Sequence, residues 1–394
     1  MGGELNGLRE QLLDTVLDRG GAVDALVADA LRTVPRHIFL PDLSPAAAYE
    51  DAAIVTKWDA EGVPSSSSSQ PTIMAIMLDQ LEPARGQKVL EIGAGTGFNA
   101  ALIAHIVGPK GSVVSIDLDP EIVARAEDNL SAAGTAGVTV LAADGALGDP
   151  AHAPYDRIIA TVGVWDIAPA WHEQLTPGGL LVVPLDLRGI QRSVCFEWAG
   201  DHWTSRSSRP CGFMRMRGPF AGPDRTVSLD PGTHLTLLLP DARELDTAAV
   251  LEALAAPEVE IATGVSPAAM ELFDGFGLWL AIHEPRWFAL SAQGADPRLP
   301  EAPLRGESGS ATSGLLDEFG LATLAMRDGE LLVIGTERIA EELAGHIATW
   351  DEAGRPGSAG LTIDAYPSGG GSAATAPGEL VIDKKYVRLV LTWA

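Results

Sequence analysis

The sequence predicts an α/β fold in which a parallel sheet is covered by helices, followed by a C-terminal α+β region. Between residues 72 and 184, short apolar runs of strand length alternate with stretches of helical periodicity. This alternation is typical of parallel sheets that are buried on both faces. The chain has 394 residues, which at roughly 150 residues per domain suggests two or three domains. The pattern of elements changes near residue 218.

Two helices are expected ahead of the sheet. Leucine and valine at helical spacing predict a helix over residues 4–18, which Gly20 and Gly21 end. A second, shorter helix follows and ends before Pro35. Residues 41–70 are rich in Pro, Ser, Asp and Gly, so we expect irregular structure there.

The alternating region is expected to contain three helices and five strands. The helices fall at 73–81, 98–107 and 120–133, and the strands at 88–92, 112–116, 138–142, 157–161 and 180–184. Residues 191–198 and those around Trp203 are expected to close the sheet as a hairpin. The chain therefore divides into an N-terminal region with the active-site loop (1–71), a sheet core (72–218) and a C-terminal region (219–394).

The C-terminal region is harder to interpret. Its composition predicts flexible tracts at 294–314 and 366–378. We expect helical or mixed structure at 315–326 and 339–349, and a strand at 387–393. The boundary near 218–225 is marked by glycine and proline.

The charge excludes several classes of partner. The chain has 27 basic and 53 acidic residues, a net charge of −26. Such a surface repels phosphate backbones and anionic lipid head groups, so no nucleic-acid or membrane partner is expected. The sequence lacks an apolar signal core and a membrane-spanning run. The two cysteines, Cys195 and Cys211, suit free thiols in a reducing cytosol. We therefore expect a cytoplasmic protein, with no metal because the histidines lack ligand spacing.

The clearest chemical signal is the segment Glu91-Ile92-Gly93-Ala94-Gly95-Thr96-Gly97, at a predicted strand-to-helix turn. Glycines let the backbone approach a ligand closely, and a helix N-terminus favours negative charge. A dinucleotide fingerprint requires G-x-G-x-x-G, and Phe98 stands where its third glycine would be. The observed spacing instead resembles that of S-adenosylmethionine methyltransferases.

Two further acids follow predicted strands. Asp117 ends the second strand, where a carboxylate can accept both ribose hydroxyls. Asp144 and Gly145 end the third strand, where an acceptor can receive the adenine amino group. Each acid alone could be an ordinary strand-end residue, but the ordered set is more specific. The expected cofactor-binding residues are Glu91, Gly93, Gly95, Gly97, Asp117, Asp144 and Gly145.

Four more segments resemble protein-L-isoaspartate O-methyltransferases, in collinear order over residues 25–217. They are V-P-R-H-I-F-L-P at 34–41, S-S-S-Q-P at 67–71, Y-D-R-I-I at 155–159 and Q-L-T-P-G-G at 174–179. The resemblance implies a Rossmann-like sheet and a carboxyl O-methyltransferase. Such an enzyme uses S-adenosyl-L-methionine, releases S-adenosyl-L-homocysteine and esterifies a carboxylate of a peptide or protein.

The resemblance also assigns residues. It places the active-site serine at Ser69, which by itself would read as an ordinary loop serine. The two arginines that we select for substrate binding belong to six between residues 186 and 217, which either steer a carboxylate or are simply solvated. The expected substrate-binding residues are Ser68, Gln70, Val164, Trp165, Arg209 and Arg215.

Three departures from the family pattern bear on the substrate. A serine run at 65–69 replaces the usual T-I, V-G-V-W-D at 162–166 replaces a small A-A-x-P loop, and the chain continues to 394. These features resemble an actinobacterial branch associated with lanthipeptides and graspetides. They favour methylation of an aspartate in a ribosomal precursor peptide, leading through a succinimide to isoaspartate, with 219–394 recognising the peptide. The alternatives are repair of isoaspartyl residues in damaged proteins and a non-catalytic binding module.

Overall fold

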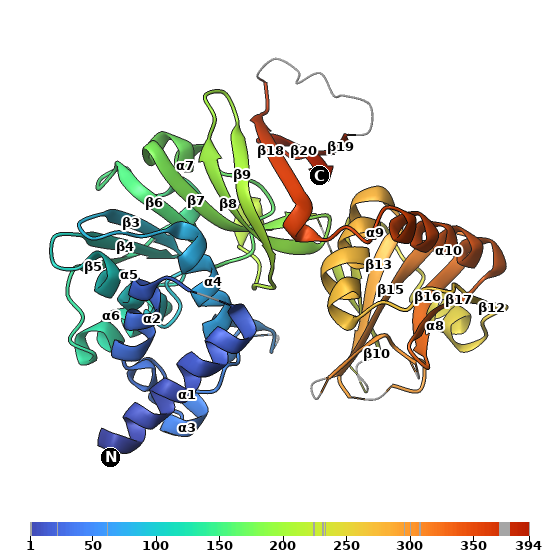
Figure 1. The fold of residues 1–394 in the computed structure, drawn as a ribbon, viewed down its shortest axis with the longest axis horizontal. Coiled ribbons are helices and arrows are strands. Elements are labelled where there is room, and N and C mark those ends of the chain that lie inside the picture. Colours follow the sequence, from blue (N-terminus) through green and yellow to red (C-terminus); the bar gives the residue numbers. More distant parts are fainter. Residues whose placement is uncertain are drawn as a thin grey trace.

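The computed structural model describes residues 2–393, apart from 22, 61, 224, 231, 233, 295, 300, 307–308 and 370–378. Two lobes lie side by side (Figure 1). The larger lobe contains the N-terminal half of the chain and, unexpectedly, its last strands. The smaller one, called the accessory lobe below, is built on a separate sheet between β10 (Arg225–Asp230) and α10 (Glu337–Glu352). The predicted flexible tract at 366–378 falls mostly outside the described residues.

The larger lobe is built on a ten-stranded sheet in the order β19-β20-β18-β9-β8-β7-β6-β3-β4-β5. Its parallel part confirms the predicted α/β fold, because apolar side chains of these strands are buried on both faces. The parallel strands are β3 (Lys88–Ile92), β4 (Ser112–Asp117), β5 (Val138–Ala142), β6 (Tyr155–Ala160) and β7 (Leu175–Leu187).

Helices cover both faces of this sheet. One apolar cluster joins it to the N-terminal helices and to α4, α5 and α6, and another to α7 and part of α9. The two predicted N-terminal helices and the three helices of the alternating region are confirmed. The helices are α1 (Gly2–Gly20), α2 (Ala25–Thr33), α4 (Pro71–Leu81), α5 (Phe98–Val107), α6 (Pro120–Ala132), α7 (Pro169–Gln174) and α9 (Gly277–His283).

The expectation of irregular structure at 41–70 was wrong. This stretch contains a short helix, α3 (Pro45–Ala48), and an antiparallel hairpin of β1 (Ile54–Trp58) and β2 (Pro64–Ser68). Serine has little preference for strands, but pairing and burial override local preference. Ser66 and Ser68 are buried on β2, so the serine run forms a strand against the rest of the lobe.

The last three strands return to the first sheet. The predicted closing hairpin is confirmed as β8 (Ile190–Trp198) and β9 (Trp203–Pro210). Beside it lie β18 (Leu361–Pro367), β20 (Val387–Trp393) and β19 (Leu380–Asp383). A division of the chain at residue 218 therefore does not follow the sheets, because β18, β19 and β20 extend the sheet of the larger lobe. Sequence order alone gave no sign of this return.

The accessory lobe has an antiparallel sheet in the order β10-β11-β13-β15-β16-β17-β12, with β14 beside β15. Segment 339–349 is helical, within α10, as expected. The expectation of a flexible tract at 294–314 was wrong at 304–306 and 309–314, which are strands, and the expectation of helical or mixed structure at 315–326 was wrong because strands occupy most of it. Short apolar runs fit either structure, and pairing decides. The strands are β11 (Leu235–Leu239), β12 (Val259–Ala262), β13 (Trp287–Ala292), β14 (Leu304–Gly306), β15 (Gly309–Asp317), β16 (Gly320–Arg327) and β17 (Glu330–Gly335).

Helices complete the accessory lobe. They are α8 (Thr247–Ala255), α9, α10 and a single π-helical turn, η4 (Glu271–Phe276), directly ahead of α9. None of the helices in the described ranges is long and apolar enough to cross a membrane.

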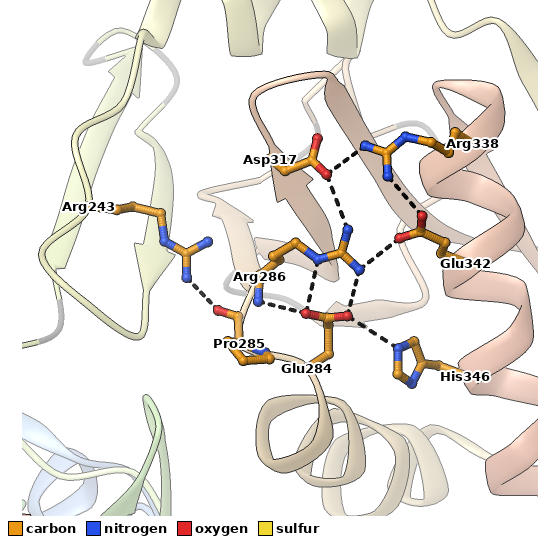
Figure 2. A network of polar contacts seen from close by, with 8 residues as sticks. All are labelled: Arg243, Glu284, Pro285, Arg286, Asp317, Arg338, Glu342 and His346. Carbon is orange, nitrogen blue, oxygen red and sulfur yellow. Dashed lines mark hydrogen bonds and ion pairs between the residues drawn. The ribbon is translucent and has the colours of Figure 1, made fainter.

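A polar network holds α10 against the rest of the accessory lobe (Figure 2). Arg286, in the turn between α9 and β13, pairs with Glu284 at 2.7 Å, with Asp317 at 3.1 Å and with Glu342 at 2.7 Å. Arg338 of α10 pairs with the same Asp317 at 2.7 Å. Because these partners come from β15, α10 and the α9–β13 turn, the network fixes three elements together.

Arginines of the β7–β8 hairpin join the two lobes. Arg188 donates from Nη1 to the backbone oxygen of Ile282 at 2.8 Å, and Trp287 Nε1 donates to the backbone oxygen of Arg188 at 2.9 Å. Arg192, which is 1% exposed, reaches the backbone of η4. The accessory lobe is therefore fastened to the sheet that carries the site described next.

Candidate active site

A cavity of about 470 Å³ lies at the carboxyl ends of β3 and β4, where ligands bind in open α/β sheets. Its walls include the glycine turn after β3, the ends of β4 and β5, the segment 65–70 and the segment 210–217 that follows β9. Of the residues expected to bind cofactor or substrate, the cavity brings together Ser68, Ser69, Gln70, Gly93, Gly95, Asp117, Asp144, Gly145 and Arg215.

The glycine turn is shaped by close packing. Gly93 has φ +103°, and a Cβ there would lie 2.7 Å from Thr161 Oγ1. Gly95 has φ +52°, and a Cβ there would lie 3.2 Å from the backbone oxygen of Ser67. Both positions therefore require glycine, and both leave an open backbone surface facing the cavity. Gly97 begins α5 and packs against α6 instead of lining the cavity.

Both strand-end acids line the cavity. Asp117 Oδ2 accepts from the amide of Gly95 at 3.3 Å, and burial raises the pKa of the Asp117 carboxyl. Asp144 Oδ1 accepts from the amide of Ala146 at 3.0 Å. A Cβ on Gly145 would lie 2.4 Å from Ile92 Cγ2. These acceptors and the glycine cradle fit the nucleoside of S-adenosylmethionine, since the carboxylates can take ribose and adenine donors.

Glu91 does not line the cavity. It is fully buried on β3 behind the glycine turn, where it accepts from Asn99 Nδ2 at 2.7 Å and from Ser115 Oγ at 2.5 Å. Burial raises the pKa of the Glu91 carboxyl to about 7, against the opposing effect of these two hydrogen bonds. Glu91 therefore links β3 to β4 and α5 through these two hydrogen bonds.

The serine segment is held from behind by residues that the sequence did not single out. Arg36, completely buried, donates from Nη2 to the backbone oxygens of Ser69 at 3.3 Å and Ala52 at 3.2 Å. Asp51 accepts from Gln70 Nε2 at 2.9 Å, so this amide is already engaged. The V-P-R segment contained the signal for Arg36, whereas nothing in the sequence marked Asp51.

Ser68 faces the cavity with an unsatisfied group. Its side chain is 3% exposed, and its hydroxyl has no hydrogen-bond partner among the described residues. Buried polar atoms are nearly always paired. A hydroxyl in this state beside a cavity is suited to a ligand that supplies the missing partner.

The predicted arginine cluster divides between several environments. Arg215 and Arg217 line the cavity, and burial lowers the pKa of Arg215. Arg209 is exposed on β9 and lies outside the cavity walls. Arg206 pairs with Glu82 at 3.2 Å. The cluster is therefore not one patch, and only its last members reach the candidate site.

The loop after β6 contributes less than expected. Val164 and Trp165 do not line the cavity, whereas Val162 does. Val164 is fully buried beside β7. The backbone oxygen of Trp165 accepts from Lys384 Nζ, a buried group whose pKa burial lowers to about 8. The segment between β19 and β20 therefore holds this loop in place through Lys384.

Cys211 lines the cavity, and burial raises the pKa of its thiol to about 12. It is thus protonated at neutral pH and unsuited to act as a nucleophile. Within the described ranges, no three His, Cys, Asp or Glu side chains gather as a metal site would require.

The fold and the cavity define a Rossmann-like, S-adenosylmethionine-dependent methyltransferase. The model of the protein-L-isoaspartate(D-aspartate) O-methyltransferase family matches residues 7–216, and the chain belongs to this family.

Two similar proteins carry the name of this family. The chain is 39% identical over 212 residues to the protein-L-isoaspartate O-methyltransferase of Methanopyrus kandleri, covering 53% of this chain and 91% of that protein. It is 39% identical over 167 residues to the enzyme of the same name from Methanococcoides burtonii, covering 42% of this chain and 79% of the relative.

A solved structure extends the similarity in fold beyond the matched family region. A protein-L-isoaspartate O-methyltransferase aligns over 90% of this chain and 96% of its own, with a TM-score of 0.52 and 24% identity. A structure described as a candidate enzyme of this type from Plasmodium falciparum, in complex with S-adenosyl-L-homocysteine, covers 53% of this chain and 98% of its own. Its TM-score is 0.45 at 13% identity. These similarities do not confirm the natural-product branch that the sequence favoured.

Proposed function

We propose that this enzyme methylates the free α-carboxylate of isoaspartyl residues in proteins and peptides, with S-adenosylmethionine as donor. The observation that carries the proposal is the shared cavity. Ser69, the glycine turn and the two strand-end acids line it together, in a chain of the isoaspartate family.

The cofactor side of the site would be held by this chain's glycine turn and acids. Asp117 would accept from the ribose hydroxyls and Asp144 from the adenine amino group, while Gly93 and Gly95 leave room for close approach of the backbone. When bound, S-adenosylmethionine supplies a methyl group on a positively charged sulfur.

The substrate side needs orientation more than acid–base chemistry. A carboxylate has a pKa of about 4 and is already ionised at neutral pH, so no general base is required. The hydroxyl of Ser69 would donate to one carboxylate oxygen and orient the other, while Arg215 and Arg217 provide positive charge in a chain of net charge −26. Such alignment is worth up to roughly 7–11 kcal/mol.

The product is set up for a further step without the enzyme. In the methyl ester, the next backbone amide nitrogen attacks the ester carbonyl carbon. The amide proton and the methoxide leave together as methanol, and a succinimide ring closes. Water then opens the ring to aspartate or isoaspartate, so repeated cycles convert isoaspartate to aspartate.

Two findings favour this function over modification of a ribosomal precursor peptide. The divergent loop at 162–166 reaches the cavity through Val162 alone, so the departure at Trp165 does not reshape the pocket directly. The accessory lobe also lies within the part of the chain that shares its fold with a solved protein-L-isoaspartate O-methyltransferase. Its presence is therefore no argument for a special substrate.

The test compares two peptides of identical sequence, one with isoaspartate and one with aspartate, using S-adenosylmethionine labelled in its methyl group. We expect base-labile methyl incorporation into the isoaspartyl peptide only. Ser69→Ala should lower kcat about tenfold to a hundredfold, since it removes a hydrogen bond to a charged group. Ser131→Ala, exposed on α6, is the matched control. Turnover of the aspartyl peptide alone would overturn the proposal and favour the precursor-peptide function.

A further inference from the structure

The accessory lobe contributes one side chain to the catalytic cavity. Phe273, on the π-helical turn η4, lines this cavity together with residues of the methyltransferase lobe. Its side chain is 46% exposed. Single π-helical turns occur frequently at functional sites, and this one places an aromatic ring at the mouth of the candidate active site.

The backbone of this turn is fixed by a buried arginine. Arg192 of β8 donates from Nη2 to the backbone oxygens of Phe273 at 3.3 Å and Asp274 at 3.1 Å, and its Nε lies 3.3 Å from Asp274 Oδ1. Because Arg192 is 1% exposed, it joins the two lobes in a desolvated environment. The arrangement orders the backbone beneath Phe273 while leaving the ring half exposed.

The same ring borders a second cavity. A hollow of about 910 Å³ on the accessory lobe is lined by Phe273 together with residues of β11, β13, β14 and β15. Its polar lining includes Thr236, Ser291, Gln293 and Ser310, together with His234, Glu301 and Arg305. Phe273 therefore borders two cavities, one lined by methyltransferase residues and the other by neutral polar side chains and a few charged ones.

We infer that Phe273 and this second cavity bind the polypeptide that flanks the isoaspartyl residue, an inference that rests on the proposed function. The catalytic cavity of about 470 Å³ must accept both the cofactor and the isoaspartyl residue, so the remaining substrate lies outside it. Small hydroxyl and amide side chains suit the backbone donors and acceptors of an extended chain, and Phe273 suits an apolar side chain beside the modified residue.

The net charge of the accessory lobe indicates which substrate sequences beside the isoaspartyl residue bind best. Residues 225–352 carry 7 basic and 22 acidic residues, so an acidic flank is repelled from this lobe. The occupant is thus an extended segment of the substrate with apolar or basic residues, and strongly acidic flanks bind less well.

The test uses two isoaspartyl peptides, one with a single residue on each side of the isoaspartate and one with long apolar and basic flanks. In Phe273→Ala, the ratio of kcat/KM for the long peptide to that for the short peptide should fall about tenfold. Ser291→Trp, which fills the second cavity from an exposed position, should lower the same ratio. Phe319→Ala is the matched control, because Phe319 is 68% exposed and lines neither cavity.

A binding measurement separates failure of this inference from failure of the proposed function. Fluorescence anisotropy of the labelled long peptide reports binding without turnover, and both variants should weaken it. If the unaltered enzyme turns over neither peptide, the proposed function fails while the binding comparison still decides the inference. An unchanged ratio and unchanged peptide binding in Phe273→Ala and Ser291→Trp would overturn it.

Discussion

Replacing Glu91 by glutamine should change how stability depends on pH. In the native enzyme this carboxyl is fully buried on β3 and has a pKa raised from 4.5 to about 7 by burial. Glutamine keeps the shape and can still accept from Asn99 Nδ2, which lies 2.7 Å from Glu91 Oε1. The substitution therefore removes the ionisation with little change in packing.

The magnitude follows from the pKa difference. A folded-state pKa above the unfolded value means that the folded protein binds the proton more tightly. The contribution of Glu91 to the free energy of unfolding is therefore fully present below about pH 4.5 and is lost as the pH rises through about 7. The full effect is about 3 kcal/mol at 1.36 kcal/mol per pKa unit. Of this, about 2 kcal/mol falls between about pH 5.5 and about pH 8.5.

The assay is denaturant unfolding followed by tryptophan fluorescence at several pH values in that window. The other titrating groups contribute equally to the parent and to Glu91→Gln, so the difference between the two curves isolates Glu91. We expect the variant to gain about 2 kcal/mol relative to the parent across the window. Parallel curves would refute the assignment of a raised pKa to Glu91, and so the reasoning from its burial.

Two further predictions concern the glycine turn and the C-terminal strands. Gly95→Ala should weaken S-adenosylmethionine binding in calorimetry at least about tenfold more than Gly134→Ala, since both glycines have positive φ but a Cβ contacts the backbone of Ser67 only at Gly95. Equal affinities would contradict a role in the cradle. Lys384→Met should lower the free energy of unfolding by about 1–3 kcal/mol near neutral pH, because it removes the donor to the backbone oxygens of Trp165 and Asp186, the second of which is buried. The pKa of Lys384 is lowered from 10.5 to about 8, so parent stability should rise between those pH values while the variant lacks this rise; identical pH profiles would disprove it.

Local patterns were sufficient for the parallel sheet. Apolar strand-length runs separated by helical periodicity predict the positions of β3 to β7 within a few residues. They do so because a strand that is buried on both faces consists almost entirely of apolar residues. The spacing of Gly93 and Gly95 with Asp117 and Asp144 likewise predicts the cofactor side of the cavity. These residues follow successive strands whose carboxyl ends meet at one edge of the sheet.

Non-local pairing was beyond the reach of such patterns. The serine run forms β2 because β1 lies beside it, and β18, β19 and β20 join the first sheet after an entire intervening lobe. Strand pairing depends on partners distant in sequence, and period-two patterns do not identify the partner. For the same reason the sequence did not single out Phe273, because only the folded structure shows that η4 places this apolar residue at the cavity.

The sequence by itself determined the class of enzyme and the cofactor edge of the sheet, because motifs at strand ends keep their geometry from local structure. Ser69 became the candidate catalytic residue only through the resemblance of 67–71 to the family. Only the tertiary structure decided which of these groups share a cavity. In the folded protein Glu91 is buried in the core, and neither Arg209 nor Trp165 lines the cavity. It also used Arg192 to bind the lobes together. The physical reason is that burial and charge pairing depend on which distant segments pack together, and neighbours in sequence do not specify that.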